Sequence, residues 1–377
     1  MRRYYLGLNA GGPKAISTLF SHGSKRDLRD LSEFLAGKYL GAPILTKNGR
    51  SALGLALKSY FEPGDKIIVN GFTCFAVIEA VKKAGMTPIF ADIEPKTLNF
   101  DVESLEKLMG DPVSHGARGI IVQNTLGNPV DMAAIEKFAK KHELLIVEDL
   151  AHSAGVKYPD GREAGTVGVA TVLSFGKDKS INAISGGAAV LRAARKHSME
   201  APVKVPHLSD YLRAKFYPLL TAMCRGLNHI HLGGGLMRLL LKIHFVERTA
   251  DSKLDFGRRM AKFEAKMALN ELREMKKRGE IREFLFVSKR EEVLKKLREA
   301  GYYFDSFWYE KPVAPERYYK EVQFPEEKCP VATKAAKRII NLPKYYSDED
   351  LKRAREIIQP YVTELRAPKI SLEKEAK

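Results

Sequence analysis

The sequence predicts an α/β protein: a mostly parallel sheet covered by helices on both faces, followed by a smaller α+β domain. Between residues 50 and 190, short apolar runs alternate with segments whose apolar residues recur at helical spacing. Such alternation is typical of parallel strands joined by crossover helices. A length of 377 residues fits one large and one smaller domain, and 45% hydrophobic residues suffice for a sizeable core.

The first domain is predicted element by element from hydrophobic spacing and from turn residues such as Pro63-Gly64-Asp65. Apolar residues at helical spacing predict helices over residues 50–60, 75–84, 102–109 and 129–142. Short apolar runs predict strands over residues 66–69, 87–91, 119–122, 144–147, 170–175 and 188–191.

The pattern changes after residue 195, and we divide the chain into residues 1–195, 196–254 and 255–377. The middle segment is an insert whose residues 204–250 combine apolar and basic side chains with little acid. Its glycine run at 233–235 predicts a break between two helices. The last segment is the predicted small domain, with a helix at 258–277, a strand at 283–287 and a helix at 348–358.

The bulk properties narrow the class of protein. Cys74, Cys224 and Cys329 are widely spaced and lack metal-ligand spacing, so we expect a reducing compartment, no disulfide framework and no metal. We see no signal peptide and no apolar run long enough to span a membrane, and we expect a cytoplasmic protein. The net charge of +17 suits nucleic acid, a membrane, anionic substrates or simply a solvated, lysine-rich surface. No nucleic-acid-binding motif accompanies it.

Ligands of parallel sheets bind beyond the carboxyl ends of the strands, so we expect the functional residues there. Asn48-Gly49-Arg50-Ser51 precedes a helix, whose exposed N–H groups suit a phosphate, and Arg50 adds a bidentate donor. Many helices begin this way without binding an anion.

The strand at 144–147 is followed by Glu148, Asp149 and then His152. These side chains suit either a structural strand end or a carboxylate that pairs with a cation.

A third polar group follows the strand at 170–175. Ser174, Lys177 and Lys179 precede the pair Gly186-Gly187, which lets the backbone pass close to a flat ligand. The lysines are either solvated or held at the sheet end, where desolvation makes an amine nucleophilic. Pyridoxal phosphate needs a lysine, a carboxylate for its ring nitrogen and an anion site for its phosphate. The three groups together match these needs.

The residues at this point resemble a known family. The chain is similar to the DegT/StrS-type sugar aminotransferases, which are pyridoxal-phosphate enzymes of fold type I, over most of residues 46–191 and 258–360. The matching segments are NGRSALGLAL, EPGDKIIVNGFTCFAV, KAGMTPIFADIEPKTLNFD, GNPVDM, IVEDLAHSAG, SFGKDKSINAISGG and CPVATKAAKRIINLPKYYSDEDL.

The resemblance implies roles for individual residues. Lys179 would form the Schiff base and move the proton, Asp149 would bind the ring nitrogen, and His152 would lie near the cofactor's 3-hydroxyl. The phosphate would be held by Ser174, Gly49 and Arg50. Lys177 is the rival nucleophile, and the spacing from Ser174 and to the glycine pair favours Lys179.

Some positions depart from the family pattern. Cys74 and Phe75 stand where the family stacks an aromatic ring on the cofactor, and Arg50 replaces a small hydroxyl residue. Gly257 replaces an asparagine that reaches the partner subunit's phosphate. The family is usually dimeric, so the resemblance implies a homodimer.

We therefore expect an aminotransferase that moves an amino group from glutamate to a nucleotide-linked keto-sugar in polysaccharide biosynthesis. One alternative is a related sugar dehydratase, but those relatives have histidine in place of the lysine. Another is a trimmed, non-catalytic or membrane-associated relative. Residues 204–250 suit an anionic membrane surface, a dimer interface or a cover over the site.

Overall fold

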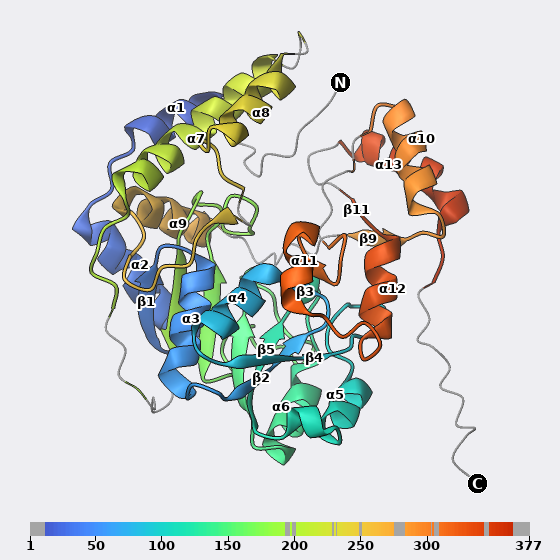
Figure 1. Cartoon of the computed structure of the whole chain (residues 1–377). Helices are drawn as coiled ribbons and strands as arrows, with labels where there is room; N and C mark the ends of the chain where they lie inside the picture. Colours follow the sequence, from blue (N-terminus) through green and yellow to red (C-terminus); the bar gives the residue numbers. More distant parts are fainter. Residues whose placement is uncertain are drawn as a thin grey trace.

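The computed structural model describes residues 12–192, 197, 201–227, 230, 232–248, 251–274, 283–302, 304, 309–342 and 347–364. A seven-stranded sheet forms its centre, in the order β1-β8-β7-β6-β5-β2-β4 (Figure 1). The strands are β1 (Ala42–Thr46), β2 (Lys66–Asn70), β4 (Thr87–Ala91), β5 (Ala117–Gln123), β6 (Leu145–Asp149), β7 (Ala170–Ser174) and β8 (Gly187–Leu191). Strands β4, β2, β5, β6 and β7 are parallel, β8 runs antiparallel to β7, and the edge strand β1 runs antiparallel to β8. The predicted mostly parallel sheet is confirmed.

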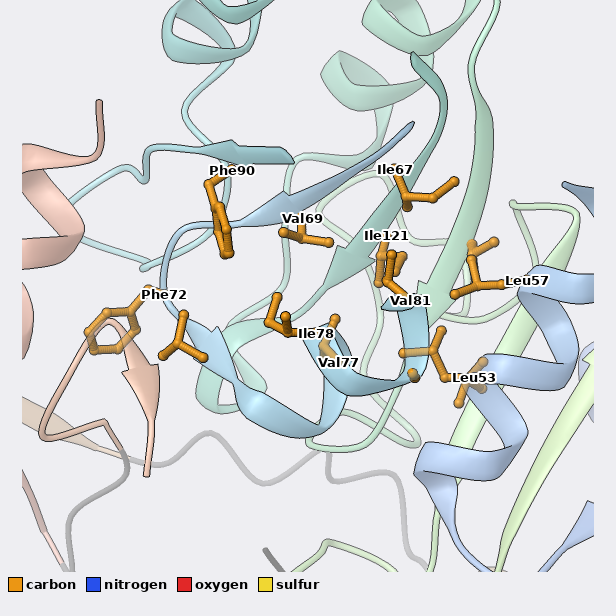
Figure 2. Packing of buried hydrophobic residues seen from close by; sticks show 14 of the residues in the cluster. Leu53, Leu57, Ile67, Val69, Phe72, Val77, Ile78, Val81, Phe90 and Ile121 are labelled. Carbon is orange, nitrogen blue, oxygen red and sulfur yellow. The ribbon is translucent and has the colours of Figure 1, made fainter. Parts of the chain in front are cut away.

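Alternate residues of each central strand enter two separate cores, one on either face of the sheet. In β6, Ile146 belongs to one core cluster and Val147 to the other. This two-residue period follows from the pleat, which points successive side chains to opposite faces. Figure 2 shows the core beneath α3 and α4, where Val77 and Ile78 of α4 lie toward Val69 of β2. Both faces are therefore covered, as a parallel sheet requires.

Helices cover the two faces unequally. The face in Figure 2 is covered by α3 (Gly49–Tyr60) and α4 (Phe75–Lys83), and the other face by α2 (Lys25–Tyr39), α5 (Val102–Met109), α6 (Met132–Lys141) and α9 (Lys262–Glu274). Sequence patterns predicted α3 to α6 but not β1 or α2. Strand β1 is a five-residue edge strand with mixed exposure, which leaves no clear apolar period.

The C-terminal part forms a second, smaller unit to the side of the sheet (Figure 1). Strands β9 (Phe284–Phe286) and β11 (Ile339–Asn341) pair antiparallel, and their cluster includes side chains of α10 (Arg290–Glu299) and α13 (Asp348–Ile358). Helix α12 (Pro330–Arg338) packs on the core of the large sheet. The sequence predicts that the small domain begins at residue 255. Helix α9 lies after this boundary, but it packs against α2 in the core of the large domain.

The insert folds as two helices, α7 (Leu208–Leu227) and α8 (Gly233–Lys242), which lie with α1 (Gly12–Phe20) in one layer (Figure 1). The glycine run at 233–235 predicts the break between the helices, but these glycines instead form the first turn of α8. Lys215 of α7 is buried and donates to the carbonyls of Thr18, Leu19 and Ser21. These three bonds gather at the C-terminal end of α1, so Lys215 fastens α7 to α1.

Glu264 in the first turn of α9 gives the fold a pH dependence. Burial raises the pKa of this carboxyl to about 8, and one of its oxygens accepts from the N–H of Ala261 at 2.7 Å. The folded state therefore holds a proton that the unfolded chain releases near its ordinary pKa of 4.5. Stability should fall as pH rises from about 4.5 to 8 and then level off, by at most about 1.4 kcal/mol per pH unit.

Glu264→Gln keeps the acceptor for Ala261 and removes the titration. We expect thermal unfolding of this variant to vary less across that pH window than unfolding of the wild type. An unchanged pH profile would show that Glu264 is already ionised in the folded protein.

Candidate active site

A cavity of about 520 Å³ lies beyond the carboxyl ends of β5, β6 and β7. Gln123, Asp149 and Ser174 end these three strands and line it, together with the start of α3 at Gly49. Because parallel strands end at one edge of the sheet, residues far apart in the sequence meet there. The cavity brings together most of the residues that the sequence singled out.

The two acids at the end of β6 have different roles. Glu148 is fully buried and accepts from Tyr158, from the backbone N–H groups of Gly165 and Gly168, and from Arg192, so it holds the fold. Asp149 faces the cavity and accepts from the N–H of Ala151 at 2.9 Å. Burial raises the pKa of the Asp149 carboxyl, while Lys179 lowers it by a smaller amount. A cation in the cavity would offset this cost of burial.

Lys179 and His152 meet at the cavity wall. The Lys179 Nζ lies 3.1 Å from the His152 Nε2, and the His152 side chain is largely buried. Both line the same cavity as Asp149. The amine, the imidazole and the carboxylate thus share one space, although Lys179 is 27 residues from His152 in the chain.

The start of α3 is held tightly against the end of β7. The Asn48 side chain caps the helix by accepting from the Ser51 N–H at 2.9 Å. A Cβ added to Gly49 would lie 2.6 Å from the Ser174 Cβ, and one added to Gly187 would lie 2.5 Å from the Gly49 N. The sequence predicts that the glycine pair lets the backbone pass close to a flat ligand. Gly187 instead lies against the backbone of Asn48 and Gly49. This close packing fixes the helix start beside Ser174.

Gly49→Ala should therefore displace Ser174 or the helix start. We expect a loss of about 1–3 kcal/mol in stability, the usual cost of overpacking, and at least about tenfold weaker binding of pyridoxal phosphate in a titration. Gly37→Ala is the matched control, since a Cβ there meets nothing within 4 Å in the interior of α2. It should raise stability slightly. Equal cofactor affinity in both variants would contradict the expectation.

Three residues predicted to bind the cofactor make contacts with other parts of the protein. Arg50 lines the cavity, but its guanidinium pairs with Glu79 of α4. Cys74 also lines the cavity and caps α4, its Sγ accepting from the Ala76 N–H at 3.4 Å. Phe75 stacks on Tyr318 with ring centroids 4.5 Å apart, and it is not among the described residues that line the cavity.

The insert forms one wall of the cavity. Tyr217 of α7 and Met237 of α8 line it, followed by Phe245. Lys177 contacts this wall. Its Nζ lies 4.1 Å from the Tyr217 ring centroid and donates to the Glu247 carbonyl. Burial lowers the pKa of Lys177 to about 8. Part of the insert thus covers the cavity, which is one of the three roles expected for residues 204–250.

Sequence patterns did not point to several of the residues that line the cavity. Gln123 and Asn124 follow the apolar run of β5, so the rule that pointed to Asp149 would have found them too. Gln123 accepts from Thr73 at 2.7 Å and donates to the Phe72 carbonyl at 2.9 Å. Arg213 and Ser252 also line the cavity, but no sequence pattern connects the insert with the strand ends.

The fold and the position of the cavity define a class. The architecture matches fold-type-I aminotransferases, with a TM-score of 0.66 to the DegT DnrJ EryC1 StrS aminotransferase from Brucella abortus, at 20% identity, covering 92% of this chain and 94% of that one. The PMP-form of the sugar aminotransferase Spr1654 from Streptococcus pneumoniae, named as putative, gives a TM-score of 0.64, at 18% identity and coverage of 92% and 94%.

The chain belongs to the DegT/DnrJ/EryC1/StrS aminotransferase family, whose profile it matches over residues 28–359. Aminotransferases of this family depend on pyridoxal phosphate. A pleiotropic regulatory protein of Geobacillus stearothermophilus is 35% identical over 145 residues, 38% of each chain. GDP-perosamine synthase of Escherichia coli O157:H7 is 35% identical over 160 residues, 42% of this chain and 43% of the relative. The match thus spans about two fifths of these relatives.

Proposed function

We propose that this protein is a pyridoxal-phosphate-dependent aminotransferase that transfers an amino group to a keto-sugar. The observation that carries the proposal is the meeting of Lys179, His152 and Asp149 in one cavity beside the start of α3. The family relatives that are named as sugar aminotransferases support it.

The residues present fit the cofactor. Asp149 is a buried carboxylate facing the cavity and would hold the proton on the ring nitrogen. The helix start at Gly49, with Ser174 against it, would bind the phosphate. Lys179 would hold the cofactor and move the substrate proton, with His152 orienting its amine. When bound, pyridoxal phosphate supplies a ring that accepts electrons from the substrate.

We further propose glutamate as the donor and a nucleotide-linked keto-sugar as the acceptor, for polysaccharide biosynthesis. GDP-perosamine synthase and a spore coat polysaccharide biosynthesis protein are among the relatives. Basic side chains at the cavity, including Arg213 and Arg248, suit a diphosphate. A dehydratase relative also matches, at 28% identity over 183 residues, but Lys179 favours amino transfer.

We propose a homodimer, as the family resemblance implies, and we propose that it acts in the cytoplasm, as the scattered cysteines suggest. Gly257 stands at the family's asparagine position, where its N–H donates to Asp255 at 2.9 Å. Among the described helices, none has the length and apolar character needed to cross a membrane.

Spectroscopy of the purified full chain tests the proposal. With pyridoxal phosphate the protein should turn yellow, and borohydride should remove the colour. Glutamate should convert the spectrum, and a panel of nucleotide keto-sugars should then reverse the conversion. A protein that stays colourless with added cofactor would refute the assignment. A coloured protein that ignores glutamate would refute the donor alone.

A further inference from the structure

The outward face of α7 is an apolar stripe. Leu208, Leu212, Phe216, Leu219 and Met223 recur at helical spacing along it, and none of these positions is charged. The Leu212 side chain is 41% exposed and that of Met223 48%. A surface helix of a globular protein normally turns polar residues outward. This helix has the opposite arrangement.

The neighbouring helices extend this apolar surface. Leu239 of α8, Ile243 just after it and Phe20 of α1 are all more than half exposed. The inward faces of α7 and α8 join one buried cluster with Ile184 and Phe263. Their exposed positions therefore point away from the rest of the molecule. We call the exposed apolar residues of α1, α7 and α8, with Ile243, the outer face.

The charge around the outer face is basic. Residues 203–248 contain seven lysines and arginines but only two acids, Asp210 and Glu247. Both acids pair within the chain, Asp210 with Lys47 at 2.7 Å and Glu247 with Arg213 at 2.6 Å. Arg238 and Lys242 are exposed on α8, and no described acid pairs with either. Exposed apolar groups flanked by unpaired bases match the headgroup region of an anionic bilayer.

A second copy of the chain is the other candidate occupant. Self-association through the outer face would bring Arg238 and Lys242 of two molecules toward each other, with no unpaired acid of residues 203–248 to balance them. Anionic lipid headgroups supply the missing negative charge. We propose that the outer face docks on an anionic membrane surface, with α7 and α8 lying in its plane.

This docking would set the cavity close to the membrane. The same two helices line the cavity with Tyr217, Met237 and Leu241 on their inward side. One helical layer would thus contact lipid on one side and the reaction space on the other. The proposal does not depend on the aminotransferase assignment, because lipid binding needs neither cofactor nor turnover.

Vesicle flotation of the full chain tests the apolar part. The wild type should float with vesicles of phosphatidylcholine plus phosphatidylglycerol, and not with phosphatidylcholine alone. Leu212→Ser/Met223→Ser, which leaves the net charge unchanged, should lower the bound fraction at least about tenfold. Circular dichroism and light scattering of the variant report its folding and mass. Wild-type protein that never floats would overturn the proposal.

The basic part has its own matched pair of variants. Arg238→Glu/Lys242→Glu should weaken binding at least about twentyfold, since each base near such a surface contributes about fivefold. Lys137→Glu/Lys140→Glu makes the same charge change on exposed positions of α6, at the opposite end of the large domain (Figure 1), and should bind like the wild type. Equal loss in both variants would mean a bulk charge effect. A fall from dimer to monomer in Leu212→Ser/Met223→Ser, with vesicle binding unchanged, would assign the face to a second copy.

Discussion

Lys179→Ala is expected to abolish amino transfer, lowering the rate by about a thousandfold or more. The side chain is the amine in the cavity that meets both a histidine, at 3.1 Å from Nε2, and the field of Asp149. A positioned proton carrier contributes about 10²–10⁴-fold, and loss of the anchoring amine adds to that. Single-turnover rates with glutamate and the absorption spectrum measure the effect. After borohydride reduction the wild type should keep the cofactor covalently attached through denaturation, and the variant should release it.

Lys177→Ala is the matched control, two residues away in the same cavity. The Lys177 Nζ donates to the Glu247 carbonyl and lies over the Tyr217 ring, so it is directed at the insert. Its replacement should keep the covalent attachment of the cofactor after borohydride reduction and loosen the wall formed by α7. If covalent attachment is lost in Lys177→Ala and persists in Lys179→Ala, the two lysines have been assigned in the wrong order.

Asp149→Asn is expected to lower the rate by about two-hundred- to five-thousandfold. The amide keeps an oxygen for the Ala151 N–H but cannot hold a proton on the cofactor ring nitrogen. Removing one partner of a buried charged pair costs about 3–5 kcal/mol, which sets the range. Single-turnover kinetics at saturating cofactor would measure it.

The same substitution should act on stability in the opposite direction without cofactor. Burial raises the pKa of Asp149, so the folded apoprotein loses stability as pH rises above 3.8, where the unfolded carboxyl ionises. The asparagine variant lacks this penalty and should be more stable than wild type at pH 7. Added pyridoxal phosphate should stabilise the wild type more than the variant. Equal stabilisation of both would argue against Asp149 as the ring-nitrogen partner.

The elements that the sequence predicts correctly are those whose local residue pattern reflects their burial. Buried strands such as β6 are short apolar runs, and α3 begins at an asparagine cap, so both are visible locally. Strand β1 lacks a clear period, because it lies at the sheet edge with a mixed exposure pattern. The antiparallel direction of β8 was not visible either, since direction depends on the path of the chain between strands.

For the site, the sequence by itself determined the residue types and their order: an acid after one strand, a lysine after the next, and a helix start with glycine. Only the tertiary structure decided which acid faces the cavity, because neighbouring strand residues point to opposite sides of the sheet. Glu148 accepts hydrogen bonds inside the protein, and Asp149 faces the cavity. It also turned Arg50 toward Glu79 and brought α7 over Lys177. Those contacts join segments distant in the chain, and local spacing carries no information about them.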